Sequence, residues 1–111
     1  MTHPTLAPGV GLGWRREIAA DLLASPSRVD FLEVVAEACF ASAPTRREAV
    51  AIARRWPVVP HGVKLSLGSA TGIDRDRARR LGALARELGA PLICEHVAFV
   101  RAGGAEIGHL T

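Results

Sequence analysis

Four residues of the sequence combine a reactive side chain with a position at the end of a short apolar segment. They are Glu37, His61, Glu95 and His96. If those segments are parallel strands, their carboxyl ends meet at one edge of the sheet, where α/β proteins bind their ligands. Carboxylates and neutral imidazoles that converge there suit a borderline divalent metal ion. A histidine at a strand end can equally be a hydrogen-bonded core residue, and both interpretations of His61 and His96 stay open at this point.

The spacing of these residues predicts how their side chains point. Successive side chains of a strand face opposite ways, so Glu95 and His96 cannot both point inward unless the chain bends between them, and we expect His96 to do so. Neighbouring strands lie about 4.8 Å apart, so His61 and His96 can reach the same ion. In that case we expect their ring nitrogens to lie about 3 to 4 Å apart.

Other polar residues have simpler explanations. Glu33 lies inside an apolar segment, 31–35, and is expected to be an interior polar group or one end of a buried ion pair, since an unpaired buried carboxylate would be costly. Ser66, Gly68 and Ser69 could cradle an anion, but the phosphate-loop pattern is missing, and an ordinary turn is favoured.

The two cysteines, Cys39 and Cys94, lack the CxxC spacing of a metal or redox motif. Cys94 lies within an apolar segment, where a reduced thiol acts as a small hydrophobe, so a metal site built on the two cysteines is not favoured. Reduced thiols fit the cytoplasm, and the N-terminus has neither the basic start nor the apolar core of a secretory signal. His3 and His109 are expected to be exposed loop histidines.

The segments that must position these residues alternate between two patterns. Short apolar β-type segments alternate with amphipathic helical ones, which indicates βα units and a parallel sheet. Asp74 is a plausible N-cap, and Gly89 ends the clearest helix. Thr45 and Glu48 match a capping box at another helix start, after a predicted loop over 36–44. The predicted strands are 8–12, 31–35, 58–63 and 92–96, and the predicted helices are 14–24, 45–56 and 74–88.

Four strands and three helices at this spacing are half of a TIM (β/α)8 barrel, whose usual length is about 250 residues. The tail, 102–111, carries no helix cap and no further apolar stripe. We therefore interpret residues 1–111 as the N-terminal part of a single α/β barrel domain that stops before the barrel closes. A flavodoxin-like open sheet remains the alternative, but it would need a fifth strand and at least one further helix.

Composition argues against several classes of protein. Hydrophobic residues make up 49% and charged residues 23% of the chain, which is typical of a globular domain. No apolar segment approaches the roughly 18 residues of a membrane-spanning helix. The net charge is +3 and the pI about 9.7, but the arginines are scattered and only 5% of the residues are aromatic, so no nucleic-acid partner is expected. The arginines expected on the solvent faces of helices are Arg46, Arg47, Arg54, Arg55, Arg79 and Arg80.

Four segments of the sequence resemble a known bacterial family. They are GVGLGWR (9–15), DFLEVVAE (30–37), VPHGVKLSLGSA (59–70) and APLICEHVAFVRAGGAEIGHL (90–110). The family is that of domain of unknown function 692 (DUF692), also called UPF0276. Its characterised members are multinuclear non-haem iron-dependent oxidases, similar to the methanobactin biosynthesis oxidase. The resemblance covers nearly the whole chain in order.

The resemblance implies a xylose isomerase-like barrel that oxidises cysteine residues of ribosomally made precursor peptides. It implies iron as cofactor, dioxygen as co-substrate and a small partner protein that binds the peptide leader. The family's histidines fall on His61 and His96, which are thereby implied to be ligands in a site of two or three iron ions. Glu95 and Glu37 are then the candidate catalytic carboxylates. Further ligands are expected from later strands of the complete barrel.

Two other functions remain open for the sequence alone, because a fold does not assign an activity. A metal-dependent isomerase or phosphodiesterase could use the same barrel. A non-catalytic scaffold could retain the barrel and lack the site. Under the oxidase interpretation, the 111-residue fragment by itself is not expected to be active.

Overall fold

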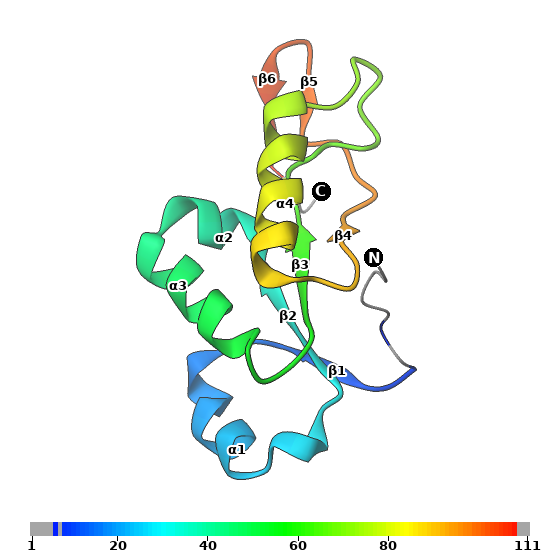
Figure 1. The fold of residues 1–111 in the computed structure, drawn as a ribbon. Helices are drawn as coiled ribbons and strands as arrows, with labels where there is room; N and C mark the ends of the chain where they lie inside the picture. The colour runs from blue at the N-terminus through cyan, green and yellow to red at the C-terminus, as the bar shows by residue number, and fades with distance from the viewer. Residues whose placement is uncertain (1–5, 7, 109–111) are drawn as a thin grey trace.

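The central sheet is parallel, as the alternating pattern predicts. The computed structural model describes Leu6 and residues 8–108. Four strands lie side by side in the order β1-β2-β3-β4, and a separate antiparallel hairpin, β5–β6, follows them (Figure 1). The strands are β1 Gly11–Gly13, β2 Phe31–Val35, β3 Val58–Gly62, β4 Cys94–Glu95, β5 Arg101–Ala102 and β6 Ala105–Glu106.

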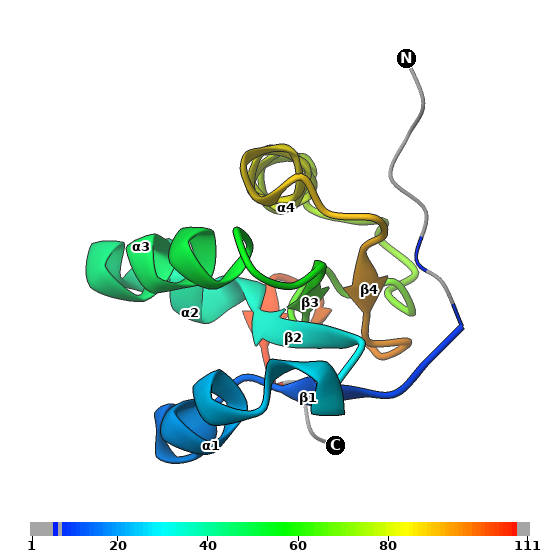
Figure 2. The same ribbon diagram turned by 60° about the horizontal axis from the view of Figure 1, so that its bottom comes forward.

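The helices lie on one face of this sheet, and Figure 2 shows α1, α3 and α4 on that face. A doubly wound sheet carries helices on both faces, so the four parallel strands and their helices form part of a TIM barrel. Among the described residues, none of the helices has the length and hydropathy needed to cross a membrane. The helices are the 3-10 turns η1 Arg16–Ile18 and η2 Pro26–Arg28, and the α-helices α1 Ala19–Ala24, α2 Ala36–Ala41, α3 Ala43–Ile52 and α4 Arg75–Leu88.

The side chains of strand β2 alternate between the face of the sheet that the helices cover and the opposite face. Leu32 and Val34 are buried beneath the helices, whereas Glu33 is half-buried and Val35 is 45% exposed on the other face, which we call the open face. The register pairs Val35 with His61, so His61 also points from the open face. The core between sheet and helices includes Leu22, Leu32, Val34, Ile52, Trp56, Val58, Leu81, Leu84 and Leu88.

Helix α4 follows its predicted limits. The Asp74 carboxylate accepts hydrogen bonds from the backbone N–H groups of Asp76 and Arg77, which caps the first turn. Gly89 ends the helix with a φ of 59°, in the left-handed region that glycine adopts without strain. The predicted solvent exposure of six arginines is confirmed, although two of them, Arg54 and Arg55, lie in the turn after α3 rather than in a helix. The exposed residues are Arg46, Arg47, Arg54, Arg55, Arg79 and Arg80.

The loop predicted over 36–44 is wrong, because Ala36–Ala41 form helix α2. Ala36 and Cys39 are 0% and 2% exposed, packed into the core. A helix of six residues is too short to be stable in water alone, so this packing stabilises it. Periodicity over so short a segment does not predict a helix.

The capping box predicted at Thr45 is also wrong. The N-cap of α3 is Ser42, whose Oγ accepts a hydrogen bond from the backbone N–H of Thr45 at 3.3 Å. Glu48 does not reach back to the helix start; it accepts hydrogen bonds from the indole N–H of Trp14 and from the Arg16 side chain. A contact 34 residues away along the chain therefore outcompetes the local one.

Predicted and observed limits differ most near the N-terminus. The strand predicted over 8–12 begins at Gly11 and ends at Gly13. The helix predicted over 14–24 begins as a 3-10 turn at Arg16 and is α-helical only from Ala19. The strands predicted over 58–63 and 92–96 are present but shorter.

A hairpin, β5–β6, spans residues 101–106, at the start of the tail in which the sequence shows no helix cap and no apolar stripe. Its central residues, Gly103 and Gly104, have φ angles of 56° and 80°. A two-residue type I′ hairpin turn requires positive φ at both positions, which glycine adopts without steric cost. The Gly-Gly pair was therefore the signal that the sequence prediction missed.

Ser42→Ala should lower the free energy of unfolding by about 1 kcal/mol, because it removes the oxygen that accepts the Thr45 amide at the start of α3. Thr45→Ala is the matched control. It deletes a hydroxyl in the first turn of the same helix and should change the free energy by less than about 0.5 kcal/mol. Urea unfolding followed by circular dichroism measures the difference. An equal or larger loss in Thr45→Ala would mean that Thr45 is the cap.

Candidate metal centre

Two imidazoles meet on the open face of the sheet. Nε2 of His61 lies 3.0 Å from Nδ1 of His96, with the ring centroids 4.7 Å apart. The register sets this contact, because His61 pairs with Cys94 and the backbone N–H of His96 donates to the Gly62 carbonyl at 3.1 Å. The predicted proximity of the two ring nitrogens is confirmed. This distance fits a hydrogen bond between the rings, provided that one of the two nitrogens carries a proton. It also fits two nitrogens that bind the same ion.

Glu95 points away from this pair, as the alternation of a strand predicts. Its carboxylate lies over Gly62 on the helix side of the sheet, where a Cβ at residue 62 would collide with Oε2. Oε1 accepts a hydrogen bond from the backbone N–H of His96 at 3.0 Å. Burial raises the pKa of the Glu95 carboxyl group and Glu37 adds to the rise, while the N–H donors of His96 and Leu65 oppose it.

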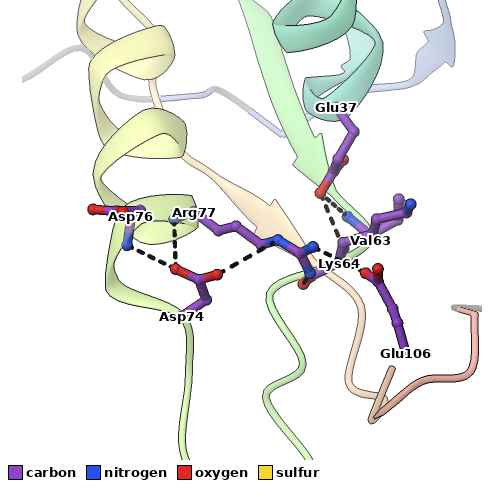
Figure 3. Close-up of polar contacts among 7 residues, drawn as sticks. All are labelled: Glu37, Val63, Lys64, Asp74, Asp76, Arg77 and Glu106. Atoms are coloured by element: carbon purple, nitrogen blue, oxygen red, sulfur yellow. Dashed lines mark hydrogen bonds and ion pairs between the residues drawn. The ribbon is translucent and has the colours of Figure 1, made fainter. Parts of the chain in front are cut away.

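Glu37 holds the chain immediately after β3. It lies in the first turn of α2, and its Oε1 accepts hydrogen bonds from the backbone N–H groups of Val63 and Lys64, each at 3.0 Å (Figure 3). Its Oε2 is buried and has no hydrogen-bond partner among the described residues. The carboxylate therefore fixes the backbone of the second and third residues after His61.

A cavity of about 260 Å³ lies beside these two carboxylates. Glu37 and Glu95 line it together with the basic side chains of Lys64 and Arg77. Arg77 donates to the Lys64 carbonyl and pairs with Glu106 of β6, each at 2.9 Å, so the hairpin is tied to the rim of this cavity (Figure 3). The two carboxylates thus face the helix side of the strands, and the imidazoles face the open side.

The open face carries two further donors beside His61. Glu33, His61 and Cys94 each offer one ligand atom, and these atoms lie within 4.8 Å of one another. Glu33 is half-buried on this face and forms no ion pair among the described residues, so the buried ion pair expected as one alternative is not seen there. Burial, and after it the Glu33 carboxylate, raise the pKa of the Cys94 thiol. Sequence reasoning missed Cys94, although a residue two positions before His96 on a strand shares its face.

These donors fit a divalent metal ion. Imidazole nitrogen, carboxylate oxygen and thiolate sulfur are ligands of zinc and of first-row transition metals, iron included. Nδ1 of His61 is buried and has no hydrogen-bond partner within the part of the chain that the structure describes, so it can serve as a ligand. Cys39, by contrast, is buried in the apolar core. His3 and His109, expected in loops, lie outside the described residues.

The loop after β3 forms a turn, the alternative that its sequence favours over an anion site. Ser66 is 1% exposed with a φ of 64°, and its Oγ accepts a hydrogen bond from the Val100 N–H at 2.9 Å. The N–H of Gly68 donates to the Ala98 carbonyl, also at 2.9 Å. These bonds hold the chain that follows His96 against the loop that follows His61.

Known proteins match most of this chain. A sequence profile described as RiPP precursor modification enzyme MbnB/TglH/ChrH matches residues 9–111. A UPF0276 protein of Streptomyces avermitilis is 46% identical over 110 residues, in an alignment that covers 92% of this chain and 22% of that protein. A UPF0276 protein of Rhizorhabdus wittichii is 39% identical over 97 residues, covering 85% of this chain and 35% of the relative. One of Haemophilus influenzae is 33% identical over 99 residues, with coverages of 86% and 32%.

This chain therefore spans between 22% and 35% of the length of these three relatives. The profile, by contrast, covers the chain from Gly9 onward and includes His61, Glu95 and His96. The relatives carry the designation UPF0276, which is also that of the family that the sequence segments resemble. The chain belongs to the MbnB/TglH/ChrH family of RiPP precursor modification enzymes.

Proposed function

We propose that residues 1–111 form the N-terminal part of a single xylose isomerase-like β/α barrel, and that the complete protein is a non-haem iron-dependent oxidase. Its substrate is a cysteine residue of a ribosomally made precursor peptide. The observation that carries the proposal is the pair of imidazoles, His61 and His96, whose nitrogens lie 3.0 Å apart on the open face of a chain from this peptide-modifying family.

In this proposal His61 and His96 hold iron at the carboxyl ends of β3 and β4, and later strands contribute the remaining ligands of a site of two or three ions. Iron bound there would supply a Lewis acid for the substrate thiolate and electrons for dioxygen. The chain itself supplies fixed geometry, because the register of β3 and β4 sets the separation of the two rings. Both rings are half-buried, which limits the access of water to them.

The catalytic role predicted for Glu37 and Glu95 stays a prediction, and their contacts favour a positioning role. Glu37 binds the backbone just after β3, and Glu95 accepts the backbone N–H of His96. Each carboxylate thus holds the backbone next to one of the two histidines. A shift of a ligand by about 1 Å is enough to impair catalysis, so such contacts matter for activity.

The partners in this proposal follow from the family. A RiPP precursor is a peptide made on the ribosome, which places the reaction in the cytoplasm, and a small partner protein would bind the peptide leader. Nucleic acid has no part in it, since the exposed arginines of α3 and α4 are scattered rather than gathered with aromatic residues.

His61→Ala and His96→Ala should each lower the iron bound by the complete protein and abolish oxidation of a cysteine-containing precursor peptide, because no apolar neighbour can replace the lost ligand. Losing only a hydrogen-bond partner of a ligand weakens metal binding about 10- to 100-fold, so at least that loss is expected. Elemental analysis and peptide mass spectrometry measure the two quantities. Arg79→Ala, on the solvent face of α4, is the control and should retain both. Full iron and full activity in both histidine variants would mean that the rings are structural.

Glu37→Gln should retain peptide oxidation within about tenfold of the wild type, because the amide oxygen can still accept the N–H groups of Val63 and Lys64. Glu37→Ala leaves both donors unpaired, at about 1–3 kcal/mol each, and should lose iron and activity together. Turnover rates and iron content of the two variants test the positioning role. Equal loss of turnover in both variants, with iron retained, would instead assign a catalytic charge to Glu37.

A further inference from the structure

We infer that Glu33, His61 and Cys94 form a thiolate-containing site for one divalent ion of the zinc, cobalt or iron class. The inference deepens the proposed function and rests on it, because His61 belongs to both sets of donors. What it adds is a sulfur ligand from the chain itself. Neither the imidazole pair nor the family assignment supplies one.

Three neighbouring strands deliver these side chains to one point. Cys94 on β4 is the register partner of His61 on β3, and Glu33 on β2 lies two residues before Val35, the other register partner of His61. All three side chains therefore leave the open face, with their ligand atoms within 4.8 Å of one another. Metal bonds of about 2.0–2.3 Å separate the ligand atoms of a tetrahedral site by roughly 3.3–3.8 Å, so modest side-chain rotations complete the site.

The charges of the group also favour a cation. The Glu33 carboxylate makes no hydrogen bond or ion pair within the part of the chain that the structure describes. A divalent cation between the carboxylate and the sulfur attracts both, and it stabilises the deprotonated form of the thiol as a ligand. A thiolate ligand selects zinc, cobalt or iron over magnesium and calcium, which prefer oxygen.

Cobalt(II) reports directly on the sulfur ligand, because thiolate-to-cobalt charge transfer absorbs in the near ultraviolet. The complete protein, stripped of metal and titrated with Co²⁺ alone, should develop this band. Cys94→Ser and Cys94→Ala should abolish the band and weaken Co²⁺ binding at least about tenfold, on the scale of losses at other metal ligands. Cys39→Ser removes the other thiol, which is buried in the core, and should retain the band. Glu33→Gln should weaken Co²⁺ binding and leave the band in place.

A second measurement needs no variant. Zn²⁺ should slow the alkylation of Cys94 by iodoacetamide in the wild-type protein at least about tenfold, as followed by peptide mass spectrometry, since a coordinated thiolate is a poor nucleophile. Absence of the charge-transfer band from cobalt-loaded wild type, its persistence in Cys94→Ala, or unchanged alkylation of Cys94 with Zn²⁺ bound would each overturn the inference.

The outcomes separate this inference from the proposed function. Loss of iron and peptide oxidation in His96→Ala, without any Cys94-dependent cobalt band, would overturn the inference and leave the oxidase proposal standing. A Cys94-dependent band in a complete protein that oxidises no precursor peptide would support the thiolate site and contradict the oxidase proposal.

Discussion

The parallel register of β2, β3 and β4 is the constraint on which the rest of this structure depends. Because side chains alternate along a strand, one register assigns Leu32 and Val34 to the helices and Glu33, His61 and Cys94 to the open face. A slip of one residue would reverse both assignments and place the polar groups in the apolar core. The burial of the core therefore fixes the geometry of the candidate site, although no core residue takes part in its chemistry.

Polar contacts position the backbone around His96, where the strands are too short to do so. Strand β4 has only two residues, so the path of the chain through His96 depends on bonds outside the sheet. Glu37 holds the backbone after β3, and Ser66 binds the N–H of Val100 beyond β4. Arg77 joins α4 to the β5–β6 hairpin through Glu106. The positions of the two imidazoles therefore depend on contacts that involve helix α2 and the β5–β6 hairpin.

The open face agrees with the proposal that residues 1–111 are part of a larger barrel. Val35 is 45% exposed there although it is a β-branched strand residue. Later strands of a closed barrel would cover such side chains and supply the further ligands that a site of two or three ions requires. The relatives, which are about three to four and a half times as long as the part of each that this chain matches, have room for them.

Local patterns in the sequence determined the limits of β2 and the cap and end of α4, since alternation, helix capping and glycine termination act within a few residues. The approach of His61 to His96 was expected from the position of both residues at strand ends, but the register of β3 and β4 sets their contact. Helix α2 and the contacts of Glu48 were decided by tertiary structure, because burial of Cys39 and a partner at Trp14 outweigh weak local preferences. The grouping of Glu33 with Cys94 was likewise decided there. Residues 61 positions apart meet only through the register of three strands, and non-local register is energetically a property of the packed sheet rather than of any one segment.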